Sequence, residues 1–370
     1  MSNKRHRVAN EHEELEIENI QNRHLAWSKT QGYILTGGGK AEEFYTAERG
    51  FPFDESELPH YHLRQNNTNT VFLEWRKSKE PCSLVSGVWN RPLFVGGWKH
   101  STENDETVFN IQTYNLFVDL RIPTTRTMSL ASNAHAIDSM DALTPMQLRL
   151  YARQHVFAGF SVFSRNDGKP HCTRHHCIDW NYVGTPRTRP NKWWIELNDD
   201  KTQWKEHSWA KDDNGHSYYF ERWQHVSNPG ATVPRLALRK SDQHARDGVL
   251  VFVGDHFNYV LGRIPTGNET KYPGQTTLID VVDAAVEAGD LTTARSYLTI
   301  EAGHGRVSND FKLDLAIPPW NEGKPLWEKG GIQVEGDSIE SCRVVWESER
   351  WDLYDCSFDT LDELKQFLST

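Results

Sequence analysis

The chain has 370 residues, of which 37% are hydrophobic and 25% charged, a composition typical of a globular protein. Its formal net charge is -10 and no basic stripe offsets it, which argues against a nucleic-acid-binding surface. No apolar run is long enough to span a membrane. The 14 Trp, 12 Tyr and 16 Phe favour β-sheet and apolar ligand sites.

The beginning of the chain carries many charges and no apolar stretch of the kind that directs export. Residues 1–40 therefore read as a charged extension. The five cysteines are few and odd in number, so we expect reduced thiols and a cytoplasmic location.

In chain order, alternating apolar and polar residues predict short strands separated by turn residues. The most regular segment is Phe109–Pro123, which reads as one long strand ended by a proline. Further strands are expected at Asn69–Lys77, Ser83–Phe94, His155–Arg165, His171–Val183, Lys192–Leu197, His216–Val226, Arg235–Lys240, Val249–Arg263, Tyr297–Glu301, Phe311–Ile317, Ile332–Glu335 and Arg343–Tyr354. Helices are expected at Pro145–Gln154, at Thr276–Ala288 and near the end of the chain.

The strand Leu116–Pro123 indicates what kind of sheet this is. Its apolar face carries Leu116, Val118, Leu120 and Ile122, and its other face carries Phe117, Asp119 and Arg121. Later strands also have one apolar face and one polar and aromatic face. We therefore predict a mainly β fold made of two antiparallel barrels with polar-aromatic interiors and a few short helices. The first barrel is expected in residues 41–240 and a smaller barrel-like part in residues 241–370.

Four segments carry a resemblance to a known family. LFVDLRIP at Leu116–Pro123 looks like a strand motif of lipocalin-like (calycin) proteins. YYFERWQHV at Tyr218–Val226, DGVLVFVGDHFNYVLGR at Asp247–Arg263 and LAIPPWNEG at Leu315–Gly323 follow it. In that order these segments resemble a fungal two-barrel lipocalin-like family known as casein-kinase interactors. The resemblance implies a calycin-type fold, but one fold hosts many functions.

Asp119 and Arg121 lie two residues apart on one strand face. An inward arginine would anchor a carboxylate or enolate, and the aspartate would orient it. The alternative is a structural ion pair between strands at the barrel rim.

The segment Lys169–Trp180 is predicted to place His171, Thr173, His175, Cys177 and Asp179 on one strand face. Such residues could ligate a metal, but no second half-site accompanies them, so no metal and no cofactor is assigned. Without a metal, His175 and Asp179 form a candidate acid–base pair.

Around Tyr218 the sequence leaves two faces open. Either Tyr218 and Arg222 line the cavity, or Glu221 and His225 do. Phe257 and Tyr259 on a neighbouring strand, with Trp194 at the rim, complete the expected ligand-binding set. The competing interpretation is that these aromatics simply fill a packed barrel.

The sequence thus predicts a protein that binds a small, partly apolar molecule inside a barrel. We expect acid–base conversion without a nucleotide cofactor, of the isomerase, cyclase or lyase type. The expected catalytic set is His175, Asp179, Tyr218, Arg121 and Asp119. Two alternatives remain open: a non-catalytic carrier, and a scaffold that captures a protein partner through residues 1–40.

Overall fold

The computed structural model describes residues 82–96, 100–124, 126, 137–181, 183, 191–209, 217, 219–226, 233–240, 246–265, 272, 277–328 and 330–369. The predicted charged extension, the strand expected at Asn69–Lys77 and the candidate Tyr218 lie outside the described residues.

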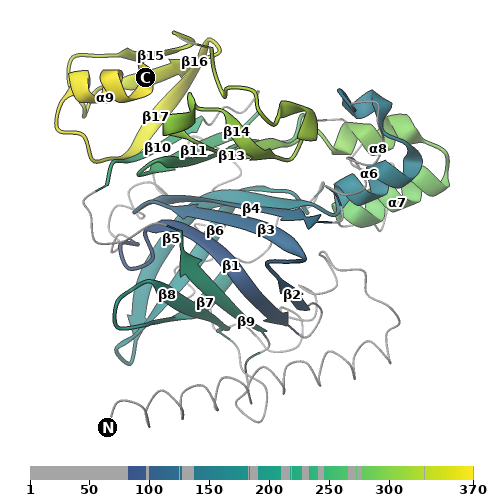
Figure 1. Ribbon diagram of the computed structural model, residues 1–370, viewed down its shortest axis with the longest axis horizontal. Helices are drawn as coiled ribbons and strands as arrows, with labels where there is room; N and C mark the ends of the chain where they lie inside the picture. Colours follow the sequence, from purple (N-terminus) through teal and green to yellow (C-terminus); the bar gives the residue numbers. More distant parts are fainter. Residues whose placement is uncertain are drawn as a thin grey trace.

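A closed antiparallel barrel forms the first half of the fold (Figure 1). Its sheet has nine strands in the order β2-β1-β3-β4-β5-β6-β7-β8-β9, and β9 also pairs with β1, which closes the ring. The strands are β1 (Gly87–Gly96), β2 (His100–Thr102), β3 (Glu106–Gln112), β4 (Leu116–Pro123), β5 (His155–Asn166), β6 (Lys169–Asp179), β7 (Asn191–Leu197), β8 (Gln203–Ser208) and β9 (Tyr219–His225). The prediction of a mainly β, antiparallel fold is confirmed, with one closed barrel and, where a second barrel-like part is predicted, a second antiparallel sheet.

A second antiparallel sheet of eight strands follows, in the order β14-β13-β12-β11-β10-β17-β16-β15. Its strands are β10 (Arg235–Lys240), β11 (Gly248–Val253), β12 (His256–Leu261), β13 (Glu301–Arg306), β14 (Leu313–Ala316), β15 (Ile332–Glu335), β16 (Arg343–Trp346) and β17 (Glu349–Cys356). One half of β17 pairs with β16 and the other half with β10. A division of the chain into folding units near residue 240 stays a prediction.

The helices are short and lie beside the sheets. They are α6 (Pro145–Ala152), α7 (Leu278–Glu287), α8 (Leu291–Tyr297) and α9 (Leu361–Ser369), with 3-10 turns η1 (Met140–Ala142), η2 (Val307–Asn309) and η3 (Pro319–Asn321). Thr144 begins α6 with a capping box, and Thr277 caps α7 by accepting a bond from the Asp280 N–H. No helix in the described ranges is long and apolar enough to cross a membrane.

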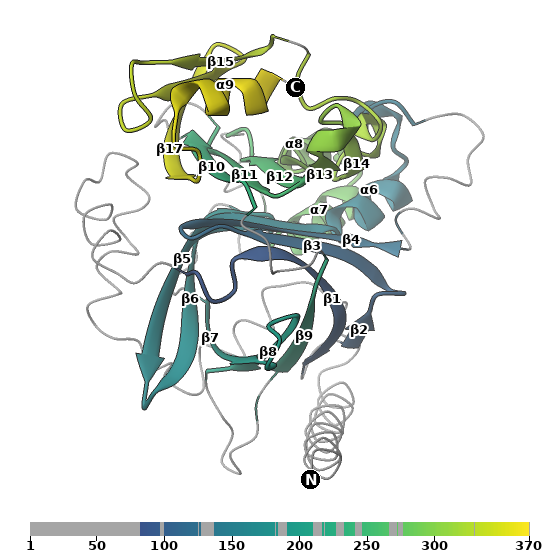
Figure 2. The ribbon, with the colours of Figure 1, turned by 60° about the vertical axis from the view of Figure 1, so that its left-hand side comes forward.

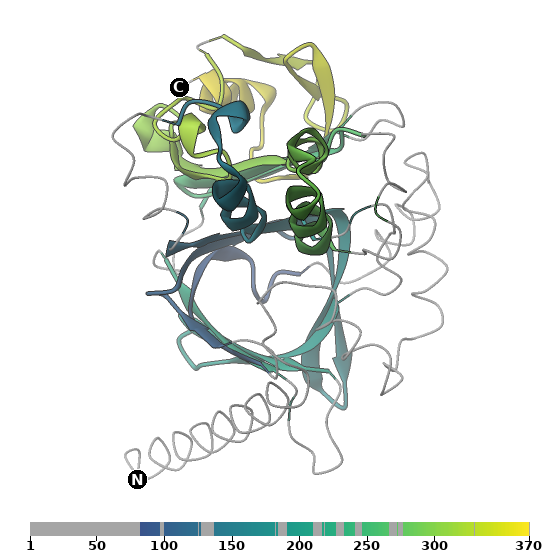
Figure 3. The ribbon, with the colours of Figure 1, turned by 90° about the vertical axis from the view of Figure 1, so that its right-hand side faces the viewer.

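The second sheet is covered on both faces. One face packs on the outer, apolar side of β3, β4 and β5, with α6, α7 and α8 at one end of this layer (Figures 2 and 3). The end of the same sheet that contains β15–β17 folds over and, with α9, covers the other face of β10–β12. Leu116, Val118 and Leu120 belong to the layer between the sheets. The side chains that alternate with them therefore face the barrel interior, as the pattern predicts.

Three predicted long strands are in fact hairpins. Phe109–Pro123 contains β3 and β4, joined by a turn in which the Thr113 hydroxyl accepts from Leu116 N–H at 3.1 Å. Val249–Arg263 contains β11 and β12, and Arg343–Tyr354 contains β16 and β17. The alternation continues across each turn, and the first turn carries neither glycine nor proline, so the pattern alone reads as a single strand.

One further predicted strand is wrong, and the sequence analysis does not predict every strand that the structure contains. Tyr297–Glu301 contains the end of α8 and a loop, and only Glu301 belongs to a strand. Strand β8 escapes the sequence analysis because Gln203–Ser208 is mostly polar, although it is a central member of the barrel wall.

A β-bulge interrupts β6 opposite Gly159. Ala158 pairs with Ile178, but Gly159 pairs with His176, so Cys177 is the extra residue. A Cβ on Gly159 would lie 1.9 Å from the carbonyl oxygen of His175, which only a glycine avoids. Because side chains alternate along a strand, the bulge changes the face on which every residue before it lies.

We expect Gly159→Ala to destabilise the protein by about 3 kcal/mol or more, since the methyl group collides with backbone rather than with a movable side chain. Gly168→Ala in the β5–β6 turn is the matched control. Its Cβ meets nothing within 4 Å, so only the positive φ of +76° opposes it, at a cost of about 1 kcal/mol. Chemical denaturation measures both variants; equal losses would contradict the tight fit at Gly159.

Candidate functional site

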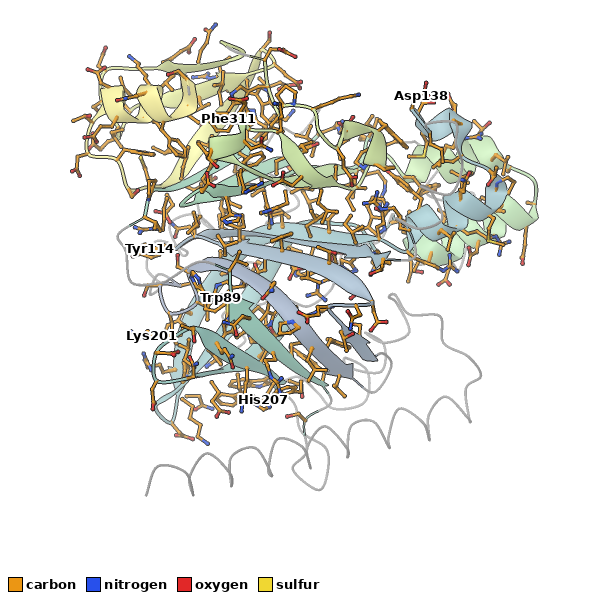
Figure 4. The ribbon with its side chains drawn as sticks, viewed as in Figure 1. Trp89, Tyr114, Asp138, Lys201, His207 and Phe311 are labelled. Atoms are coloured by element: carbon orange, nitrogen blue, oxygen red, sulfur yellow. The ribbon has the colours of Figure 1, made fainter. Side chains whose placement is uncertain are left out.

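Contacts between strands that do not pair with each other identify the side chains inside the barrel. The Arg121 guanidinium on β4 lies 3.8 Å from Glu221 on β9, although β3 and β1 separate these strands. Trp89 on β1 and Trp204 on β8 meet edge to face at 6.0 Å. Figure 4 shows Trp89 within the ring of strands. The interior is therefore both charged and aromatic.

An ion network occupies part of this interior. Arg91 donates to Glu106 at 2.6 Å and to Glu221 at 3.3 Å. Arg121 donates through Nε and Nη2 to the two oxygens of Asp119, at 2.7 and 3.0 Å. Each strand in the network supplies only one or two of the charges, so the network exists only when the barrel is closed.

Burial and charge compete at Asp119. Burial raises the pKa of this carboxyl, but the paired Arg121 and the nearby Arg174 outweigh it, so the pKa falls below its usual value. The pKa of Arg121 is raised, because Asp119 and Glu221 more than compensate for its burial. Both groups are therefore charged across the physiological range.

Arg174 on β6 differs from these residues because much of it is unpaired. Its side chain is 2% exposed and donates to Asp119 through Nη1 at 3.4 Å. Among the described residues, its Nε and Nη2 have no hydrogen-bond partner. Asn110 on β3 is fully buried and pairs in register with Asp119, and both atoms of its amide also lack a partner there.

Glu206 on β8 is a carboxyl held in its neutral form. Burial raises its pKa and the neighbouring Glu221 raises it further, while Arg174 and the bond from Tyr219 oppose them, giving a pKa of about 8. The Tyr219 hydroxyl donates to Glu206 at 2.5 Å. Glu206 is therefore a buried group that can donate a proton near neutral pH.

A histidine–aspartate pair lies further along the interior. His176 Nδ1 is 2.6 Å from Asp179, and the His176 ring stacks on Phe157 at 4.6 Å. Burial raises the pKa of Asp179, but the bond to His176 and the nearby His155 lower it overall. The pair includes the predicted Asp179, but its histidine is the one next to the predicted His175.

The structure separates the predicted site residues into two groups. Phe117, Asp119, Arg121 and Asp179 face the interior, as expected. His175 does not, because the bulge at Cys177 places it on the outer face opposite Phe160, so the single face predicted for His171–Asp179 is wrong.

Other predicted ligand-binding residues also lie outside the interior. Trp194 stacks on Trp209 outside the barrel wall, at 4.2 Å between ring centroids. Arg222 alternates with the inward Glu221, so of the two faces left open around Tyr218, the one with Glu221 and His225 faces inward. Phe257 and Tyr259 belong to the core of the second sheet.

The sequence analysis missed several interior residues. They are Arg91, Asn110, Arg174, His176, Glu206 and Tyr219. The alternation of residues along each strand is the one sequence signal that indicates which side chains face the interior. It identifies these residues only if the position of the bulge in β6 and the existence of β8 are known, and the sequence pattern contains neither.

The histidines and cysteines of β6 form no metal site in this structure. Within the described ranges, no group of three or more His, Cys, Asp or Glu side chains is placed to hold a metal ion. His171 instead packs against Trp209 at 4.7 Å. Burial and the nearby Lys192 lower its pKa to about 4, which keeps it neutral.

The fold and site define a closed antiparallel barrel with a charged and aromatic interior. No protein-family model matches the sequence, and no curated protein matches it significantly. Among solved structures, the crystal structure of uncharacterized protein YLR301w from Saccharomyces cerevisiae is similar over 73% of this chain and 98% of that chain. The identity is 12% and the TM-score 0.38, so the match carries no argument about function.

We expect Glu206→Gln to change how stability depends on pH. In the wild-type protein the folded state keeps the Glu206 proton up to about pH 8, while the unfolded chain loses it near the ordinary glutamate pKa of 4.5. The free energy of unfolding should therefore fall with rising pH in this window, by up to about 1.4 kcal/mol per pH unit. The Gln variant has no proton to lose and should lack this fall.

Urea denaturation at several values between about pH 5 and about pH 8 measures the effect. Glu335→Gln on the exposed face of β15 is the control and should follow the wild-type profile. Parallel profiles for wild type and Glu206→Gln would show that Glu206 ionises normally.

Proposed function

We propose that the barrel binds a small, partly apolar molecule in its interior. The observation that carries this proposal is the set of unpaired polar atoms on Arg174 and Asn110. A buried donor or acceptor without a partner costs about 1–3 kcal/mol, and native proteins contain few of them. Arg174 bonds to Asp119 and Asn110 pairs with it in register, and the four such atoms on these two side chains are explained if a bound molecule supplies the missing partners.

The rest of the interior supports a partly apolar ligand. Trp204 and Trp223 stack at 5.4 Å, and with Trp193 they form a buried aromatic wall. The indole N–H of each also lacks a partner in the described part of the chain. The closed ring consists of β1 and β3–β9, with the short β2 outside it, and an eight-stranded barrel has room for one small ligand. The lipocalin-like resemblance also supports the binding of a small molecule inside the barrel. We propose that the protein is a cytoplasmic carrier or enzyme.

Acid–base conversion of the ligand is the second candidate, and Glu206 favours it. A neutral carboxyl hydrogen-bonded to Tyr219 can give up a proton and take it back, which suffices for isomerisation, cyclisation or dehydration. In this proposal Glu206 and Tyr219 replace the predicted His175 and Tyr218, while Asp119 and Arg121 hold the charge network. Capture of a protein partner through residues 1–40 remains the alternative.

Native mass spectrometry of the full chain, compared with the denatured mass, tests binding directly. We expect an additional organic mass in the native spectrum that disappears on denaturation. If the native protein carries no additional mass and no compound in a small-molecule panel raises its melting temperature, the binding proposal is contradicted.

We further expect Asn110→Leu to stabilise the empty protein while weakening ligand binding. Leucine has the shape of asparagine without its unpaired amide, so the free energy of unfolding should rise by about 1 kcal/mol. A residue selected for stability alone would not show this opposition.

Asn258→Leu is the matched control, because this buried amide is fully used. Its Nδ2 donates to the carbonyls of Phe109 and Val118, and its Oδ1 accepts from His304 Nδ1 at 2.9 Å. Its replacement should destabilise the protein by about 2 kcal/mol or more. Thermal unfolding compares the two variants; destabilisation by Asn110→Leu of the same size would mean that Asn110 has a structural role.

A further inference from the structure

The three arginines of the interior differ in how many of their donors are used. Arg91 donates to two carboxylates, and Arg121 uses its Nε and Nη2 edge on Asp119. With respect to the described residues, Arg174 uses only Nη1, at 3.4 Å, and its Nε and Nη2 edge is open. Arg121 uses the same Nε and Nη2 edge to bind Asp119. In an arginine this edge can donate to both oxygens of one carboxylate at once.

Two aromatic rings pack against the guanidinium that carries this open edge. The Arg174 guanidinium lies 4.1 Å from the Phe117 ring centroid and 4.9 Å from that of Trp193. These contacts hold the cation without using its N–H groups. The edge is therefore preorganised for an acceptor that the described residues do not provide.

The charge on Arg174 is only partly compensated. Asp119, the nearest acid, is engaged by both Nε and Nη2 of Arg121 at shorter distances. The other acid close to Arg174 is Glu206, which is neutral at physiological pH because burial raises its pKa to about 8. Arg174 is therefore the arginine of this network whose N–H groups are least used by the described carboxylates.

We infer that the barrel ligand carries a single carboxylate, which the Nε and Nη2 edge of Arg174 receives, with the Asn110 amide beside it and the apolar body against Trp193 and Phe117. This inference rests on the proposed binding function. A monoanion fits better than a phosphate, because Arg91, Arg121 and Arg174 already face three carboxylates, on Glu106, Asp119 and Glu221, and a dianion would add more uncompensated charge.

Matched pairs of acids and amides test the inference. Cinnamate, indole-3-acetate and decanoate are each titrated beside their primary amides at about pH 7, with tryptophan fluorescence and calorimetry as readouts. At least one acid should bind about tenfold more tightly than its amide. Arg174→Met should reduce that ratio to about one, and Arg174→Lys, which lacks the planar fork, should fall in between.

Two further variants separate binding from folding. Arg222→Met on the outer face of β9 should keep the wild-type ratio. Asn110→Asp leaves Arg174 intact but adds a carboxyl group opposite Asp119 in the same interior, so it should weaken the acids and spare the amides. If Arg174→Met fails to fold, Asn110→Asp alone decides.

The outcomes distinguish the two proposals. Amides that bind as well as acids to the wild-type protein would overturn the carboxylate inference and leave the binding function standing. A preference for acids that persists in Arg174→Met and in Asn110→Asp would overturn the role of Arg174. If neither acids nor amides bind and the native mass is bare, the binding function itself is overturned.

Discussion

Compensation of buried charge is the constraint on which this barrel depends. Arg91, Glu106 and Glu221 come from β1, β3 and β9, and Arg121 reaches Glu221 across the interior. Removing one partner from such a network leaves an uncompensated buried charge, which costs more than the pair contributes. The network therefore connects strands that do not pair in the sheet, such as β4 and β9. It also determines where in the barrel interior a further charge would be compensated.

The second sheet completes the barrel from outside. The outer face of β3–β5 is apolar and needs cover, which β10–β13 and the helices supply. Asn258 on β12 also donates to the carbonyls of Phe109 and Val118, and the His304 ring stacks on Phe109 at 3.7 Å. Burial lowers the pKa of His304 to about 3, so this contact stays neutral. The strands that carry Asn110 and Asp119 are held from both sides.

Sequence alternation predicts which face of Leu116–Pro123 packs against the second sheet. Both faces of the strand are largely buried, but only the face in the apolar layer carries aliphatic residues alone. It cannot predict the hairpin turn at Thr113, since the alternation passes through it without a glycine or proline. It also fails at His175, because one extra residue at Cys177 reverses the face of the preceding segment. The prediction of the fold class stays correct despite such errors. The prediction of a site does not, because the face on which each site residue lies depends on the local register.

The Glu206 proton and the open edge of Arg174 belong to one charge balance. With Glu206 neutral, Arg91, Arg121 and Arg174 face three carboxylates on Glu106, Asp119 and Glu221, and the His176–Asp179 pair lies apart from them. A further negative charge can come from ionised Glu206 or from a ligand carboxylate. Both together would repel each other in a medium of low dielectric constant. A bound carboxylate therefore favours the proton on Glu206, which places a proton donor in the same interior as the ligand when the ligand is present.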